Sequence, residues 1–193
     1  MLMSLPEAPL VIGLHGPRGV GKDPIARALR KLAGERIAYL PSNVAAYDML
    51  RKLLEFYEPE EAEAEAWLAE RRDEPCPHLG GRTMRLALQT LQTEWGRTVM
   101  GGELWRAAWR GQCENLLAIG FVVVNASVRF EDEAAAVRAF GGIMVDVSRP
   151  SHVVDDPHVS ERQRVDCDFR VAITEPGGVE AAARQILETI GGE

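Results

Sequence analysis

The sequence predicts an α/β fold, in which a parallel sheet is flanked by helices. Short apolar runs suited to buried strands alternate with segments whose apolar residues recur at helical spacing. FVVVNAS, residues 121–127, carries a continuous apolar run that is typical of a strand covered on both faces. A glycine-rich turn, GPRGVGK at residues 16–22, follows the first apolar run and precedes a helical pattern. We therefore expect a single α/β domain over residues 1–193.

In the first half of the chain, strand and helix patterns alternate before a charged segment. The expected elements are a strand at 10–16, a helix at 23–32, a strand at 36–40 and a helix at 43–57. The alanine-rich, charged residues 58–74 predict a solvated helix. Two prolines and two glycines mark 75–81 as a loop. Residues 58–80 are therefore expected to form a helical or loop insert.

The second half repeats the alternation with longer helices. The expected helices are 83–97, 103–119, 131–140 and 179–190, and the expected strands are 121–127, 143–147 and 169–173. Residues 149–168 are polar and contain two prolines and two histidines. This composition predicts a long, mobile, lid-like segment.

Charge and composition exclude several classes of protein. The formal net charge of -7 argues against tight non-specific binding to nucleic acid, which needs a basic surface. No apolar run approaches the roughly 18 residues of a membrane span, so no membrane partner is expected. The three cysteines are widely spread and match neither a zinc pattern nor a disulfide framework. These features predict a cytoplasmic protein.

The glycine-rich turn fits a phosphate-binding loop as far as its lysine. Glycines allow successive backbone N–H groups to turn towards phosphate oxygens, and the helix that follows adds its positive end. The lysine would reach the β- and γ-phosphates of a nucleotide. The alternative is a strand-to-helix turn that binds no nucleotide. The residues expected to bind ATP are Gly16, Arg18, Gly19, Val20, Gly21, Lys22, Asp23 and Pro24.

Two residues depart from the usual loop, in which a hydroxyl residue follows the lysine. Asp23 would hold Mg²⁺ through water, or it is a carboxylate favoured by the N-terminal end of a helix. Pro24 fits the first turn of a helix but has neither an N–H nor a hydroxyl group. One phosphate contact commonly made at this point would therefore be missing.

Five segments follow the loop in a fixed order. They are GRTMRLALQTLQTEWGR (81–97), ELW (103–105), VRFEDEAAAVRAFGG (128–142), SRP (148–150) and HVSE (158–161). In this order they resemble the deoxynucleoside monophosphate kinases of tailed bacteriophages. Those proteins carry a GKD-type loop, an LQ-x-x-G/T-E/D-x-x-R helix, a D-V-R-F-x-x-E segment after the third strand and a late H-x-S-E segment. The resemblance covers about residues 10–190.

The resemblance implies a P-loop NTPase fold of the nucleoside monophosphate kinase type. It implies transfer of the ATP γ-phosphate to a deoxynucleoside monophosphate, in the host cytoplasm if the chain is phage-encoded. We expect ATP and Mg²⁺ as cofactors, and the sequence leaves a homodimer open. The residues implied beyond the loop are Gln89, Glu94, Trp95 and Arg97 on the acceptor side, Arg129 at the end of the third strand, and His158, Ser160 and Glu161 in the late segment.

Residue chemistry adds further candidates. Residues 82–110 hold five arginines against two glutamates, in an otherwise acidic chain, and the planar guanidinium suits phosphate. Trp95 and Trp105 would stack a base or belong to the core. Arg129 and Arg149 follow strand ends, where ligands of open α/β sheets bind. The expected catalytic residues are Lys22, Arg129, Arg97 and Asp23, and the residues added for the acceptor are Arg82, Gln92, Trp105 and Arg149.

Three departures from the family pattern lie towards the expected catalytic centre. Pro24 replaces a threonine, Ser127 replaces the aspartate of D-V-R-F, and PSNVA (41–45) replaces an A-D-P-like segment. They leave open a divergent active kinase, a kinase that phosphorylates a hydroxymethylated base in phage DNA, and a weakened nucleotide-binding relative. DNA is a partner only under the second alternative. Asn125, a polar residue on an apolar strand, would partly compensate for the lost carboxylate.

Overall fold

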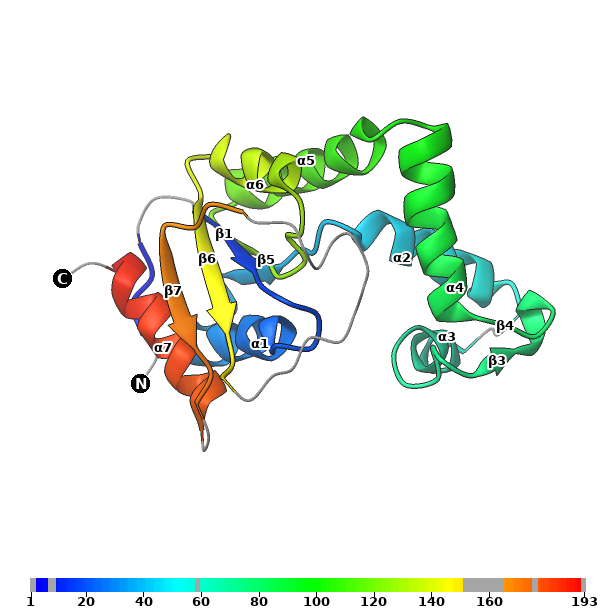
Figure 1. Cartoon of the computed structure of the whole chain (residues 1–193), viewed down its shortest axis with the longest axis horizontal. Helices are drawn as coiled ribbons and strands as arrows, with labels where there is room; N and C mark the ends of the chain where they lie inside the picture. Colours follow the sequence, from blue (N-terminus) through cyan, green and yellow to red (C-terminus); the bar gives the residue numbers. More distant parts are fainter. Residues whose placement is uncertain (1–2, 7–9, 58–59, 151–164, 175–176, 192–193) are drawn as a thin grey trace. The chain divides into compact units, whose positions relative to one another are not determined.

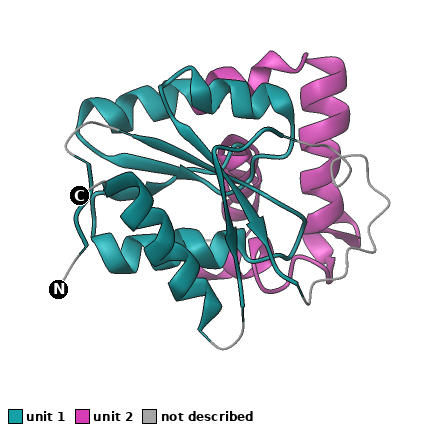
Figure 2. Ribbon diagram, turned by 60° about the vertical axis from the view of Figure 1, so that its left-hand side comes forward, with its two compact units in different colours: residues 1–42, 110–193 teal, residues 43–109 magenta. Residues whose placement is uncertain are grey.

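The described chain forms two compact units. The computed structural model describes residues 3–6, 10–57, 60–150, 165–174 and 177–191. The first unit consists of residues 1–42 and 110–193, and the second of residues 43–109 (Figure 2). The expected insert, 58–80, lies inside the second unit, which extends beyond it on both sides.

A five-stranded sheet forms the centre of the first unit (Figure 1). Its strands are β1 (Val11–His15), β2 (Ile37–Tyr39), β5 (Val122–Asn125), β6 (Ile143–Ser148) and β7 (Phe169–Ala172). They lie in the order β2-β5-β1-β6-β7, and every neighbouring pair is parallel. Each strand matches an apolar run in the sequence, so the predicted parallel sheet is confirmed.

Helices flank this sheet. On one face, α1 (Lys22–Ala33) and α7 (Gly178–Gly191) pack side by side over apolar residues of all five strands. On the other face, α6 (Glu131–Arg138) packs against β1 and β6 (Figure 1). Because both faces are covered, β1 reads as an uninterrupted apolar run rather than an alternating one.

The path of the chain creates a switch point between β1 and β6. From β1 the chain runs through α1 to β2 at one edge of the sheet, whereas β6 is followed by β7 at the opposite edge. In open α/β sheets, ligands bind beyond the carboxyl ends of two such neighbouring strands. The glycine-rich turn begins directly after β1, so it lies at this point.

The second unit is mainly helical and has its own core. Its elements are α2 (Val44–Glu55), α3 (Glu61–Leu68), β3 (Pro75–Cys76), a short 3₁₀ turn (Pro77–Leu79), β4 (Arg82–Thr83), α4 (Met84–Gln89), a π-type segment η2 (Thr90–Val99) and the start of α5 (Glu103–Ala118). Buried residues from α2, α3, β3 and α4 form the core; they are Leu50, Leu54, Ala64, Trp67, Leu68, Cys76, Met84 and Leu88.

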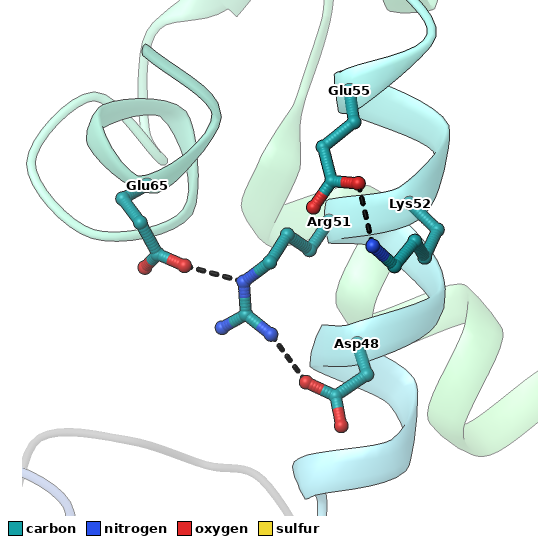
Figure 3. A network of polar contacts seen from close by, with 5 residues as sticks. All are labelled: Asp48, Arg51, Lys52, Glu55 and Glu65. Carbon is teal, nitrogen blue, oxygen red and sulfur yellow. Dashed lines mark hydrogen bonds and ion pairs between the residues drawn. The ribbon is translucent and has the colours of Figure 1, made fainter. Parts of the chain in front are cut away.

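The segment 58–74, expected as a solvated helix or a helical insert, is helical in part but is not solvated throughout. Its helical part, α3, buries Ala64, Trp67 and Leu68 in the core of the second unit. Arg51 of α2 also bridges to Glu65 of α3 and to Asp48 of its own helix (Figure 3). The many glutamates of this segment obscure the short apolar face in the sequence. The expected loop at 75–81 contains strand β3, which pairs with β4.

The helix expected over 83–97 changes its winding. It begins as α4, where the Thr83 hydroxyl accepts a hydrogen bond from the Leu86 N–H at 3.2 Å. From Thr90 to Val99 the winding is wider, as shown by a hydrogen bond from the Met100 N–H to the Trp95 carbonyl, five residues back.

Among the described residues, no helix is both long and apolar enough to cross a membrane.

Candidate functional site

The turn between β1 and α1 requires glycine at several positions. Gly16, Gly19 and Gly21 have φ values of 145°, 77° and 117°, a region that other residues rarely adopt. A Cβ on Gly16 would also collide with the Val147 carbonyl oxygen at the end of β6. A Cβ on Gly21 would lie 2.5 Å from the Ile173 Cδ1 atom. The strand ends around the turn therefore leave little room for a side chain at Gly16 or Gly21.

Lys22 holds the turn closed around its ammonium group. The residue is 7% exposed, although lysine is rarely buried without partners. Its Nζ atom donates hydrogen bonds to the carbonyls of Gly16 and Pro17, the latter at 2.8 Å. The positive charge is therefore fixed inside the loop, at the N-terminal end of α1, where an anion would bind.

Asp23 and Pro24 occupy the first turn of α1. The Tyr39 hydroxyl donates a hydrogen bond to Oδ1 of the exposed Asp23 at 2.6 Å. Pro24 is the third residue of α1, and the first N–H groups of a helix have no partner within it. Proline therefore removes no hydrogen bond of the helix at this position.

The segment after β5 lies beside the start of the loop. The His15 Nδ1 atom, at the end of β1, lies 3.2 Å from the Val128 carbonyl oxygen. The next residue is Arg129, whose backbone N–H donates to the Glu133 carboxylate at 2.8 Å. Glu133 also accepts from the Phe130 N–H, so it fixes the backbone where α6 begins. Sequence analysis missed Glu133, although its place three residues after Phe130 matches half of a capping box.

Arg149 lies against the glycine-rich turn. It follows β6 directly, and its Nη2 atom is 3.5 Å from the position that a Cβ on Gly21 would occupy. The sequence predicted Arg149 as a residue that binds the acceptor. The geometry places its guanidinium beside Gly21, in the loop that carries Lys22.

A buried polar network occupies the carboxyl ends of β2 and β5. Asn125 is 1% exposed, and its amide nitrogen donates to the Ser42 hydroxyl at 2.7 Å. Its oxygen accepts from the N–H groups of Ser42 and Ser127 and from the Ser127 hydroxyl. Ser127 therefore takes part in a neutral network at the position where the phage-kinase pattern that the sequence resembles has a carboxylate. The network satisfies the amide of Asn125 and explains how a polar residue is accommodated there.

In the second unit, Trp105 packs directly on the π-type segment. It is 8% exposed, and its indole N–H donates to the Gln92 carbonyl at 2.9 Å. Its ring covers Gly96, where a Cβ would overlap the indole. Trp95 is 38% exposed, and its ring centroid lies 6.0 Å from that of Trp105. Of the two rings, Trp95 is the more accessible one for stacking.

The wider winding brings Gln92 and Arg97 onto one face. Residues five apart would be separated by about 140° around a regular α-helix. In the π-type segment, hydrogen bonds join residues five apart, so residues at this spacing lie on the same face of the helix. Gln92 and Arg97 are half-buried, whereas Arg82, Gln89 and Glu94 are exposed.

Several arginines of the basic segment are engaged in ion pairs. Arg85 binds Asp73 with two nitrogens, one of them at 2.6 Å, and this hydrogen bonding raises the pKa of Arg85. Arg106 pairs with Glu103 at 2.9 Å. The basic character expected over 82–110 is therefore reduced by local carboxylates.

Asp48 and Glu131, two further carboxylates of the described chain, are also paired. Asp48 binds Arg51 and Glu131 binds Arg138, the latter at 2.6 Å.

The predicted site residues His158, Ser160 and Glu161 lie outside the described residues, as does most of the expected lid-like segment.

The cysteines form no disulfide and are poorly suited to nucleophilic chemistry. Burial, with Glu114 nearby, raises the pKa of the Cys113 thiol to about 12. Burial and the neighbouring Asp146 raise the pKa of Cys167 to about 11. Because the thiolate is the reactive form, these thiols are largely unreactive at neutral pH.

Comparisons with known proteins do not assign the chain to a family. No protein-family model matches the sequence, and no curated protein is significantly similar to it. The features that bear on function are therefore the geometry of the loop and the order of the sequence motifs.

Proposed function

We propose that the chain is a P-loop kinase that transfers the γ-phosphate of ATP to a deoxynucleoside monophosphate or a close analogue. One observation carries the proposal: the buried Lys22 ammonium, held by carbonyls inside a turn whose glycines have positive φ. Phosphoryl transfer needs positioning and positive charge more than covalent help from the protein. The resemblance to phage kinases supplies the class of acceptor.

The loop provides the proposed donor site. Backbone N–H groups of the turn and the start of α1 would bind the β- and γ-phosphates, and Lys22 would exchange its carbonyl partners for phosphate oxygens. Arg149 adds charge at the same loop. Arg129 follows β5 next to the start of the loop, where the transferred group would lie. Arg97, in the second unit, is proposed to bind the phosphate of the acceptor.

Asp23 fits a magnesium ion bound together with ATP. Mg²⁺ is usually held by one or two carboxylates together with phosphates and water. Among the described residues, no three acidic, histidine or cysteine side chains gather into a metal site. The nucleotide would therefore supply most ligands. Bound there, the ion would neutralise charge that develops on the phosphates.

The proposal is tested with labelled ATP and a panel of acceptors. The panel contains the deoxynucleoside monophosphates, their hydroxymethyl analogues, and DNA containing hydroxymethylated bases. Transfer to a free monophosphate is the expected result. Transfer to DNA alone would favour the base-modifying alternative. Binding of ATP without transfer to any acceptor would contradict kinase activity and favour a binding protein.

Replacing Pro24 with threonine should tighten ATP binding by up to about tenfold or raise the transfer rate. The change restores an N–H and a hydroxyl group in the first turn of α1, and hydrogen bonds to charged groups are the stronger ones. Calorimetric titration with ATP, alongside thermal unfolding of both proteins, measures the effect. Weaker binding by a variant of normal stability would show that the loop depends on the fixed φ of proline.

A further inference from the structure

We propose that Tyr39 is a positioning residue, which holds Asp23 in the orientation that binds the magnesium ion of Mg-ATP. This inference rests on the proposed function and extends it to a residue that no sequence motif singled out. The observation behind it is the hydrogen bond of 2.6 Å from the Tyr39 hydroxyl to Oδ1 of Asp23.

The bond is of a kind that can fix a carboxylate. Distances of about 2.5–2.7 Å are typical of a hydroxyl that donates to a charged oxygen, and such bonds are about twice as strong as neutral ones. An exposed aspartate in the first turn of a helix can otherwise adopt several rotamers or accept from free N–H groups of its own helix. Tyr39 engages Oδ1 and leaves Oδ2 for another partner.

Asp23 occupies the position at which a carboxylate can act on the metal. In phosphate-binding loops, the residue directly after the lysine carries the hydroxyl group that binds Mg²⁺. Asp23 follows Lys22, so its carboxylate takes the place of that hydroxyl and would hold the ion through water. A carboxylate at this position repels the phosphates unless it faces the ion. Its orientation therefore decides whether it helps or hinders nucleotide binding.

Tyr39 is itself held by the sheet. It is the last residue of β2 and pairs in register with Val124 of β5. The next N–H, that of Leu40, donates to the Val124 carbonyl at 2.9 Å. The phenol is 43% exposed, so its hydroxyl reaches Asp23 from a rigid strand without being buried in the core. A group that orients a ligand is most effective when its own backbone is fixed.

The test measures how ATP binding depends on Mg²⁺, without an acceptor and therefore without turnover. Tyr39→Phe removes only the hydroxyl, and Tyr57→Phe, whose exposed ring stacks on His78, is the matched control. We expect Tyr39→Phe to raise the Mg²⁺ concentration for half-maximal ATP binding about tenfold, as loss of an orienting partner does at metal sites. ATP binding by Tyr39→Phe in excess chelator should stay unchanged. Tyr57→Phe should change neither the Mg²⁺ concentration for half-maximal ATP binding nor ATP binding in excess chelator.

A second variant separates orientation from structure. In an Asp23→Ala background, the change at Tyr39 should have no further effect on the Mg²⁺ requirement, because the two residues act as one unit. An unchanged Mg²⁺ requirement in Tyr39→Phe would overturn the inference. The inference would also be overturned if Tyr39→Phe lost ATP binding to the same extent with and without Mg²⁺. If the unmodified protein binds no ATP under any condition, the proposed function itself fails, and this outcome is distinct from the other two.

Discussion

Replacing Lys22 with alanine should lower kcat/KM for phosphate transfer about 100-fold or more. The ammonium is the charge closest to the proposed phosphates, and removing a preorganised group of this kind costs about two to three powers of ten. The carbonyls of Gly16 and Pro17 would also lose their donor, so the loop would no longer be held closed. Steady-state kinetics with labelled ATP measure the loss.

Lys31→Ala is the matched control for this prediction. Lys31 lies on the same helix, is exposed, and takes no part in closing the loop. Its removal should leave kcat/KM within about twofold of the original value, as is usual for a surface change. Near-normal activity in Lys22→Ala would refute the assignment of the glycine-rich turn as the donor site.

Replacing Gly96 with alanine should destabilise the second unit by about 1–3 kcal/mol. The added methyl group would overlap the rigid, buried indole of Trp105, and overpacking a filled core costs about 1–3 kcal/mol. The ring could move away only by breaking its hydrogen bond to the Gln92 carbonyl, worth about 1 kcal/mol. The better helix propensity of alanine offsets up to about 1 kcal/mol of this cost.

Tryptophan fluorescence during urea unfolding measures the stability that the second unit loses in Gly96→Ala. All four tryptophans lie within residues 43–109, so the signal reports the second unit. Gly111→Ala is the control, because Gly111 lies in α5 with open space around its Cβ position. That variant should be equally or slightly more stable than the original chain. A Gly96→Ala variant that unfolds at the original urea concentration would contradict the packing described for Trp105.

The sheet and the glycine-rich turn were predictable because their signals are local. Residues 10–14 and 121–124 are apolar without interruption, and parallel strands covered on both faces need such runs. The turn needs glycines at fixed positions before Lys22, so seven consecutive residues, 16–22, determine its geometry. The elements of the first unit accordingly agree with their predicted ranges to within a few residues.

The contacts between distant residues could not be predicted in the same way. Nothing in the spacing of Tyr39 and Asp23 indicates that a strand end and a helix start would meet through a hydrogen bond. The change of winding at Thr90 leaves the apolar pattern of the sequence unaltered, and the packing of the Trp105 ring against Gly96 joins residues nine positions apart. The buried face of α3 was hidden by surrounding glutamates, because composition averages over both faces of a helix.

The closed state of the glycine-rich turn has a consequence for the entropy of ligand binding. Lysine loses about 1.5–2 kcal/mol of rotamer freedom when its side chain becomes ordered. The Lys22 side chain is already ordered by the carbonyls of Gly16 and Pro17 when the chain has folded. An arriving phosphate would therefore meet a side chain with little rotamer freedom left to lose, and the affinity would depend on how far the new hydrogen bonds exceed the two that they replace.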